Sequence, residues 1–143
     1  EKWAVIADTR GTLVWPETDD KNRLCLVSEL APREYLDYLK KNGISYIAVG
    51  KKSIDLKEAV RILETEFGSK RIGVVGGGHI NGSFLEAGLI DEVSMVYGAG
   101  IDGRSSQPTA FEGIPESHTV PYKLTLQSVE KVADQSVWIR YTV

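Results

Sequence analysis

The sequence predicts an α/β chain with a mainly parallel sheet, flanking helices and a C-terminal antiparallel hairpin. Short apolar runs alternate with segments whose apolar residues recur at helical spacing, and this alternation is typical of parallel sheets. The last fifth of the chain instead alternates residue by residue, with Val137 and Ile139 on one side and Trp138 on the other. That period of two predicts a hairpin formed by residues 122–132 and 136–143.

Three strands are expected in the first half of the chain, at the apolar runs 3–7, 24–27 and 44–49. Each run is too short for a helix and is bounded by residues that favour turns, which is typical of buried strands. The stretch between the first two runs, residues 8–23, is rich in Gly, Thr, Asp and Pro. We expect it to be a loop.

Two helices are expected between and after these strands. The first begins near Pro32 and ends at Gly43, because proline suits a first helical turn and glycine suits the residue after a last turn. The second follows Asp55, whose spacing to Glu58 resembles a capping box, and ends near Gly68.

Beyond the second helix the pattern repeats with shorter elements. We expect a fourth strand at residues 71–75, a short helix near 80–87 and a fifth strand at 93–97. Three strands alternating with two helices from residue 44 to residue 97 indicate βαβαβ winding, which places the strands in a parallel sheet.

Composition and charge exclude several classes of protein. The 143-residue chain of 15.8 kDa is 42% hydrophobic, which supports one core and hence a single domain over residues 1–143. Its 17 basic and 20 acidic residues nearly balance, and no apolar run approaches the roughly 18 residues of a membrane span. One cysteine and two histidines argue against a disulfide or a metal site. We therefore expect a cytoplasmic protein without nucleic-acid or membrane partners.

The most informative stretch is the glycine cluster Gly76-Gly77-Gly78, which follows an expected strand and precedes an expected helix. Glycine allows positive φ and lets another molecule approach the main chain closely. The N-terminus of the following helix offers unpaired N–H groups and a positive dipole end, which suit a phosphate. We expect phosphate binding here, with a tight strand-to-helix turn as the alternative. Asn81 stands where the dinucleotide fingerprint has glycine, and no P-loop ending follows.

The surrounding motifs give a specific resemblance. V-G-G-G at 75–78, A-G-L-I-D-E at 87–92, Gly103 and Phe111 resemble the reductase domain of riboflavin biosynthesis, a member of the dihydrofolate reductase-like superfamily. The resemblance covers nearly the whole chain. It implies a dihydrofolate reductase-like fold, NADPH as cofactor, hydride transfer to a small-molecule substrate such as a pyrimidine ribosyl riboflavin precursor, and a homodimer.

The resemblance also places site residues by position, although it assigns no catalytic residue. It implies that Ser28 lies near the adenosine 2′-phosphate of the cofactor. It further implies that the cofactor's pyrophosphate is cradled by the backbone of the glycine cluster and of the next two residues, Gly76, Gly77, Gly78, His79 and Ile80. The side chain of His79 either donates to a phosphate or is a solvated neighbour of the helix start.

Two departures from the family pattern leave alternatives open. Val75 stands where the biosynthetic reductases usually carry a glutamate that helps form the substrate site, which favours another substrate. The family's first strand, its S-L-D-G-like segment and the following helix have no counterpart here. We therefore expect an N-terminally truncated domain from a longer protein, which self-associates through an unpaired sheet edge and turns over NADPH poorly. The alternative is a non-catalytic nucleotide-binding or regulatory domain of the same fold.

The segment from Asp8 to Leu13 superficially resembles a phosphatase motif, D-x-D-G-T-L. In that chemistry the first aspartate attacks phosphorus and the second is the general acid. Arg10 occupies the second position here and cannot donate a proton in that role. We therefore favour a polar loop at the edge of the sheet.

Overall fold

The computed structural model describes residues 2–18, 21–133 and 135–143 of the chain. The chain divides into two compact units, the first ending at Ile72 and the second covering Gly73–Val143. One unit contains a parallel sheet and the other an antiparallel sheet, and helices accompany both. The α/β fold class expected from the sequence is confirmed.

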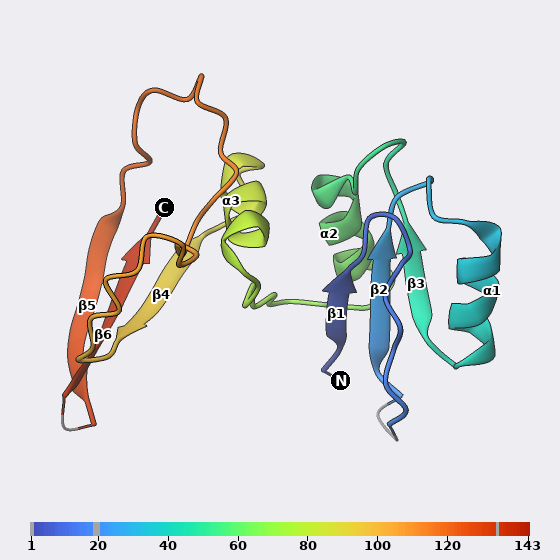
Figure 1. Cartoon of the computed structure of the whole chain (residues 1–143), viewed down its shortest axis with the longest axis horizontal. Helices are drawn as coiled ribbons and strands as arrows, with labels where there is room; N and C mark the ends of the chain where they lie inside the picture. Colours follow the sequence, from blue (N-terminus) through green and yellow to red (C-terminus); the bar gives the residue numbers. More distant parts are fainter. Residues whose placement is uncertain (1, 19–20, 134) are drawn as a thin grey trace. The chain divides into compact units, whose positions relative to one another are not determined.

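The first unit is built on three parallel strands in the order β1-β2-β3 (Figure 1). The strands are β1 (Ala4–Ala7), β2 (Arg23–Val27) and β3 (Ser45–Ala48). Their positions confirm the three strands predicted from the apolar runs. β2 is the central strand, with Val5 beside Leu24 on one side and Ser45 beside Leu24 on the other. A strand covered on both faces is apolar throughout, which explains the continuous run.

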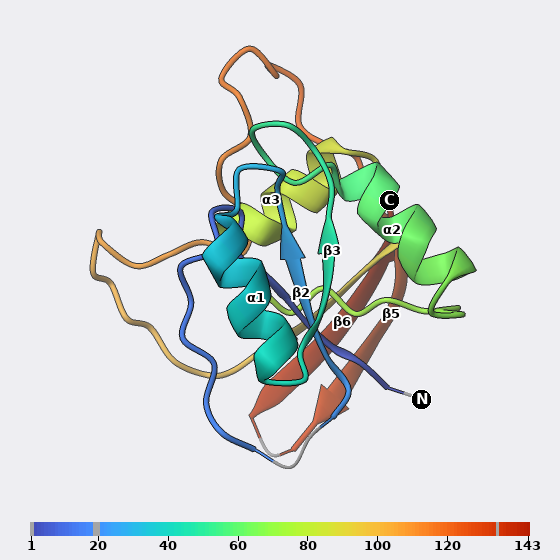
Figure 2. The same ribbon diagram turned by 90° about the vertical axis from the view of Figure 1, so that its right-hand side faces the viewer.

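Two helices cover opposite faces of this sheet (Figure 2). They are α1 (Arg33–Lys41) and α2 (Leu56–Thr65). Leu39 of α1 lies in one core cluster with Cys25, and Leu63 of α2 lies in a second cluster with Leu24. Because successive residues of a strand point to opposite faces, Leu24 and Cys25 place these two clusters on the two sides of β2.

The helix ends largely follow the sequence signals. Pro32 precedes α1, and Gly43 follows it with a φ of +66°, a conformation that glycine adopts at little cost. Asp55 caps α2 by accepting a hydrogen bond from the backbone N–H of Glu58 at 3.0 Å. The reciprocal half of the capping box is not formed: the backbone N–H of Asp55 donates to the carbonyl of Val49 at 3.2 Å, and the Glu58 carboxylate pairs with Arg61 at 2.7 Å.

Cys25 is expected to resist thiol reagents in the folded chain. Its side chain is fully buried, and burial raises the pKa of its thiol to about 11. At pH 8 about one thiol in a thousand is then ionised, against roughly one in four in an unfolded chain. Labelling should therefore be at least about 100-fold slower than in urea and should rise about tenfold per pH unit up to pH 10. Equal rates with and without urea at pH 8 would contradict this burial.

The second unit contains one helix and a three-stranded antiparallel sheet in the order β4-β6-β5. Its elements are α3 (Gly78–Glu86), β4 (Glu92–Tyr97), β5 (Thr125–Val132) and β6 (Ser136–Thr142). β5 and β6 pair with Val129 beside Ile139, which confirms the predicted C-terminal hairpin. The turn expected near residues 133–135 includes Asp134, which lies outside the described residues.

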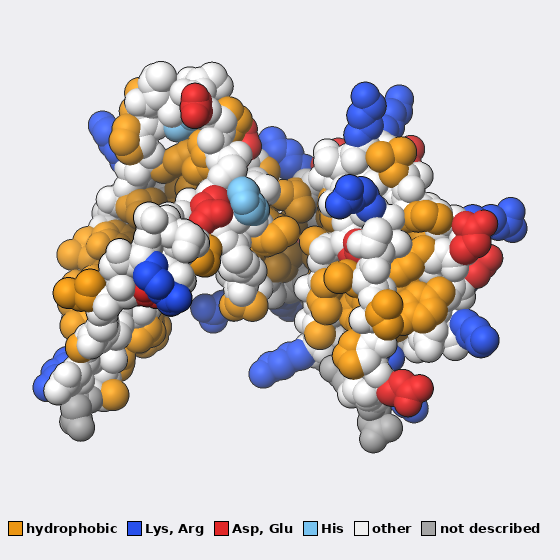
Figure 3. All heavy atoms as spheres, viewed as in Figure 1, with side chains coloured by type: hydrophobic (Ala, Val, Ile, Leu, Met, Phe, Trp, Pro, Cys, Tyr) orange, Lys and Arg blue, Asp and Glu red, His pale blue; other side chains and the backbone are white. Residues whose placement is uncertain are grey.

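One face of this antiparallel sheet carries exposed apolar side chains, which Figure 3 shows over the strands at its left. Tyr97, Leu126 and Val129 lie beside alternate residues of β6, so they share this face. Each of the three side chains is at least half exposed, Tyr97 at 50%, Leu126 at 55% and Val129 at 56%. Apolar area of this kind on a sheet is typical of a surface that another element or molecule covers.

The strand predicted at residues 71–75 is not formed, and the predicted βαβαβ winding from 44 to 97 is wrong. Residues 71–77 belong to no strand, and β4 pairs with β6 in the antiparallel direction. A strand requires a partner for its backbone hydrogen bonds, and no described residue hydrogen-bonds to the backbone of 71–75. Val75 is correspondingly 95% exposed. An apolar run therefore identified a segment suited to a strand without identifying a partner for it.

Candidate functional site

The glycine cluster lies at the N-terminus of α3, as the sequence predicts. Gly77 precedes the first helical residue in an extended conformation, with φ −67° and ψ 174°, and no side chain of the described residues caps this end of the helix. The first helical hydrogen bond runs from the N–H of Asn81 to the carbonyl of Gly77 at 3.1 Å. The backbone N–H groups of residues 77–80 meet no acceptor among the described residues. Unpaired N–H groups at a helix N-terminus form a site for an anion.

The three glycines of the cluster differ in their surroundings, and none of them has a positive φ. The freedom of glycine to adopt a positive φ is therefore not used in this cluster. A Cβ added to Gly77 would meet nothing within 4 Å, so this position is open to an approaching molecule. A Cβ on Gly76 would lie 2.9 Å from the side chain of Ile80. A Cβ on Gly78 would lie 2.6 Å from the carbonyl oxygen of Thr109, so there the close approach is made by the chain itself.

Residues 109–113, which we call the strap, pack directly on α3. Gly82 lies one turn after Gly78, and a Cβ on Gly82 would be only 2.0 Å from the carbonyl oxygen of Glu112. The N–H of Glu112 donates to the carbonyl of Gly78 at 2.8 Å, and the Asn81 side-chain amide donates to the carbonyl of Ala110 at 2.8 Å. The strap was missed in the sequence analysis. The four-residue spacing of Gly78 and Gly82 was the available signal, because it puts two residues without side chains on one helix face.

His79 projects from the first turn of α3, with its side chain 80% exposed. Its Nε2 lies 3.4 Å from Oε2 of Glu112, whose other carboxylate oxygen accepts a hydrogen bond from the N–H of Thr109. The Nδ1 edge of the ring lies against Gly113, where an added Cβ would be 2.8 Å from Nδ1. The imidazole is therefore placed by the strap, beside the unpaired N–H groups of α3.

Ser28, the residue expected near the adenosine 2′-phosphate, belongs to the first unit and follows β2. It is fully buried, and its hydroxyl donates to the carbonyl of Thr9 at 2.7 Å and accepts from the N–H of Leu30 at 3.3 Å. A phosphate only accepts hydrogen bonds, and the single proton of this hydroxyl is already used. A phosphate contact from Ser28 stays a prediction, and it requires the bond to Thr9 to break.

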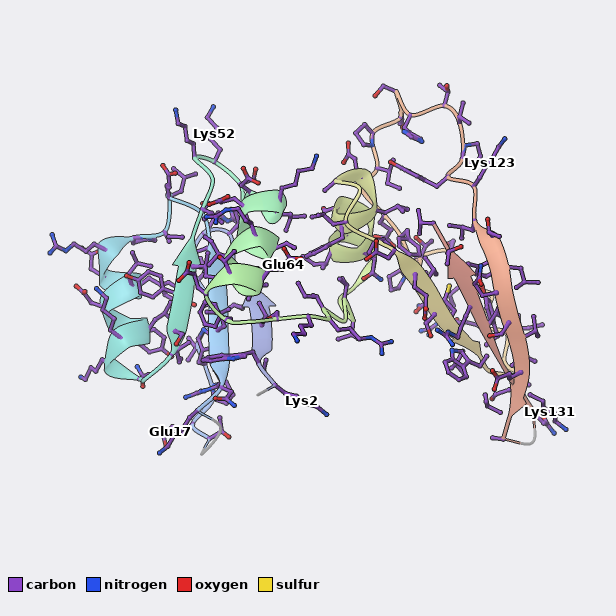
Figure 4. All side chains as sticks on the ribbon, turned by 180° about the vertical axis from the view of Figure 1, so that it is seen from behind. Lys2, Glu17, Lys52, Glu64, Lys123 and Lys131 are labelled. Carbon is purple, nitrogen blue, oxygen red and sulfur yellow. The ribbon has the colours of Figure 1, made fainter. Side chains whose placement is uncertain are left out.

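Exposed lysines follow the neighbouring strand β3. The N–H of Glu29 donates to the carbonyl of Gly50 at 2.8 Å, which ties together the loops that follow β2 and β3. Lys51 and Lys52 come next and are exposed, and Figure 4 shows Lys52 pointing away from the sheet. These cations lie at the end of parallel strands where open α/β sheets bind ligands.

Asp8, the first residue of the phosphatase-like segment, stabilises the loop that follows it through hydrogen bonds to its backbone. The carboxylate accepts hydrogen bonds from the N–H groups of Thr12 at 2.7 Å and Leu13 at 2.8 Å. Burial alone would raise the pKa of Asp8, but hydrogen bonds from Leu13, Tyr35 and Thr12 outweigh it and hold the pKa below its usual value. A carboxylate used in this way supports the interpretation as a structured polar loop.

The described part of the chain contains neither a candidate metal cluster nor a candidate membrane-spanning helix. Within it, no three His, Cys, Asp or Glu side chains come together in a way that could hold a metal ion. Of the helices it contains, none is long and apolar enough to cross a membrane.

The parallel sheet between two helices, the antiparallel sheet and the glycine-led helix place the chain in the α/β class. Solved structures share this fold. A pyrimidine reductase-like protein from Corynebacterium diphtheriae superposes with a TM-score of 0.79 at 17% identity, covering 96% of this chain and 59% of that one. Acinetobacter baumannii RibD superposes with a TM-score of 0.76 at 22% identity, covering 96% of this chain and 36% of that one.

The chain belongs to the RibD C-terminal domain family, whose sequence model matches residues 3–138. The resemblance to riboflavin-biosynthesis reductases stated from the motifs is thereby confirmed. A 2,5-diamino-6-ribosylamino-4(3H)-pyrimidinone 5′-phosphate reductase from Archaeoglobus fulgidus is 27% identical over 117 residues, which are 81% of this chain and 50% of that protein. The protein of the same name from Aquifex aeolicus is 29% identical over 96 residues, 67% of this chain and 42% of that protein. The chain thus spans half or less of the length of these relatives.

Proposed function

We propose that the chain functions in an NADPH-dependent reductase of the riboflavin pathway and that the N-terminus of α3 binds the pyrophosphate of the cofactor. The observation that carries this proposal is the set of unpaired backbone N–H groups at residues 77–80, beside the open position at Gly77. Such a site fits the oxygens of a pyrophosphate, because each oxygen accepts hydrogen bonds and the helix end is positive. The site residues proposed are those expected from the sequence, Ser28, Gly76, Gly77, Gly78, His79 and Ile80.

In the proposed reaction the side chains of this chain bind and orient the reactants. The cofactor supplies the hydride, and the protein binds the cofactor and orients it against the substrate. We propose a small-molecule substrate of the pyrimidinone ribosyl phosphate class, because both relatives described above are named for reducing one. Val75 stands where the family usually carries a substrate-site glutamate, so another small-molecule substrate is the alternative.

We also propose a single reductase domain, a homodimer and a cytoplasmic location. The family match runs through both units, from residue 3 to residue 138, which supports one domain. The apolar face of the antiparallel sheet, with Tyr97, Leu126 and Val129 half exposed, supports self-association. A biosynthetic reductase acting on small molecules supports the cytoplasm.

The test is a titration of the chain with NADPH and with NADH, in which NMR spectra are recorded at each addition. We expect NADPH to shift the backbone amide signals of residues 77–80 more than any others in the second unit, because their N–H groups would gain acceptors. Absence of these shifts at saturating NADPH would overturn the proposed site. A parallel assay of NADPH oxidation with a pyrimidinone ribosyl phosphate distinguishes a reductase from a non-catalytic nucleotide-binding or regulatory domain. Binding without turnover would favour the non-catalytic nucleotide-binding domain.

A further inference from the structure

A carboxylate lies beside the same helix end that we propose binds an anion. Glu112 is carried there by the strap, and its side chain is only 27% exposed. A Cβ on Gly78 would be 2.9 Å from the carboxyl carbon of Glu112, which shows how close the carboxylate comes to the first turn of α3. A negative charge at this place interacts favourably with the positive end of the helix. The carboxylate accepts no hydrogen bond from residues 77–80, so it lies beside their unpaired N–H groups and its charge already compensates the positive helix end.

Glu112 also engages His79, a side chain in the first turn of α3 that could donate to a phosphate. The Nδ1 edge of His79 lies against Gly113, so Nε2 is the ring nitrogen that remains accessible. That nitrogen lies 3.4 Å from Oε2 of Glu112. A phosphate that takes a hydrogen bond from Nε2 must therefore draw His79 away from Glu112.

Resting on the proposed cofactor site, we propose that Glu112 is a specificity-determining residue that makes the α3 N-terminus selective against small free anions. Its charge repels any phosphate at this helix end. Its contact with Nε2 of His79 also makes that nitrogen less available as a hydrogen-bond donor to a phosphate. A dinucleotide makes further contacts along its length that outweigh this penalty. Inorganic phosphate and pyrophosphate have no such contacts, so they bind more weakly than they would without the Glu112 charge.

The deciding experiment compares Glu112→Gln with the wild-type chain in binding inorganic pyrophosphate and NADPH by calorimetry. Glutamine keeps an oxygen that accepts the hydrogen bond from Thr109 but carries no charge. We expect Glu112→Gln to bind pyrophosphate about three- to tenfold more tightly, because a like charge within a few ångströms is removed from a partly buried site. The matched control is Glu116→Gln, an exposed carboxylate a few residues further along, which should leave the affinity unchanged.

The wild-type chain gives an independent measurement that does not depend on how the variant folds. On addition of pyrophosphate, the imidazole NMR signals of His79 should shift as Nε2 leaves Glu112, and the backbone amide signal of Thr109 should stay in place. Unmoved imidazole signals at saturating pyrophosphate would overturn the role of Glu112.

The outcomes separate this inference from the proposed function on which it rests. If NADPH shifts the amides of residues 77–80 but folded Glu112→Gln binds pyrophosphate no more tightly than wild type, only the role of Glu112 is wrong. If neither chain binds NADPH or pyrophosphate, both the site and the role of Glu112 are wrong. Tighter pyrophosphate binding by Glu112→Gln, with moving His79 signals in the wild type, supports both.

Discussion

Replacing Gly82 with valine should detach the strap from α3 and destabilise the second unit by about 2–3 kcal/mol. A Cβ at this position would lie 2.0 Å from the carbonyl oxygen of Glu112 and 3.2 Å from its nitrogen, and backbone atoms cannot give way as a flexible side chain can. Valine would make a slightly better helix residue than glycine, by a few tenths of a kcal/mol, which is too little to offset the clash. The measurement is urea unfolding, followed by far-UV circular dichroism.

The matched control is Ser83→Val, one residue along the same helix. Ser83 is exposed, and its hydroxyl only bonds back to the carbonyl of His79 within α3, so the same side chain is accommodated there. Hydrogen exchange locates the effect. The N–H of Glu112, which bonds to the carbonyl of Gly78 at 2.8 Å, should lose protection in Gly82→Val and keep it in Ser83→Val. Equal stability of the two variants would show that the strap is not packed on Gly82.

The elements that depend on short-range signals were predictable from the sequence. Gly43 ends α1 and Asp55 begins α2, because capping is a matter of residues within one turn of the helix end. The hairpin of β5 and β6 follows from its alternation, and Val129 and Ile139 do face each other. The glycine cluster does precede a helix. In each case the interaction that decides the structure joins residues close in sequence or on one repeating face.

The parts that depend on distant partners were not predictable in the same way. Residues 71–75 have the composition of a strand, but pairing is a property of two segments, and no described segment pairs with this one. Gly78 could have served a turn, a ligand or a neighbouring segment, and only the structure shows that Thr109 occupies the space. The hydroxyl of Ser28 is likewise used by Thr9, nineteen residues away. Residue type indicates what a group can bind, and the fold decides what reaches it.

Gly77→Val should weaken NADPH binding at least tenfold, which is about 1.4 kcal/mol, while leaving the fold intact. At φ −67° and ψ 174° any residue is tolerated, and an added Cβ meets nothing within 4 Å, so the substitution causes neither strain nor a clash. The loss should arise only when the cofactor is present, because the valine side chain then occupies the space through which phosphate oxygens reach the N–H groups of residues 77–80. Fluorescence titration with NADPH measures it.

Gly73→Val is the matched control for this substitution. Gly73 also has open space around it and no positive φ, and it lies a few residues before the cluster. Both variants should stay folded, with Gly77→Val somewhat less stable because valine is a poorer N-cap than glycine. Only Gly77→Val should lose affinity for NADPH. Because Gly77 differs from Gly73 chiefly in standing next to the unpaired N–H groups of α3, the difference between the two variants isolates access to that helix end. Unchanged affinity in a folded Gly77→Val chain would place the cofactor elsewhere, whereas an equal loss in both variants would trace the effect to the backbone rather than to the site.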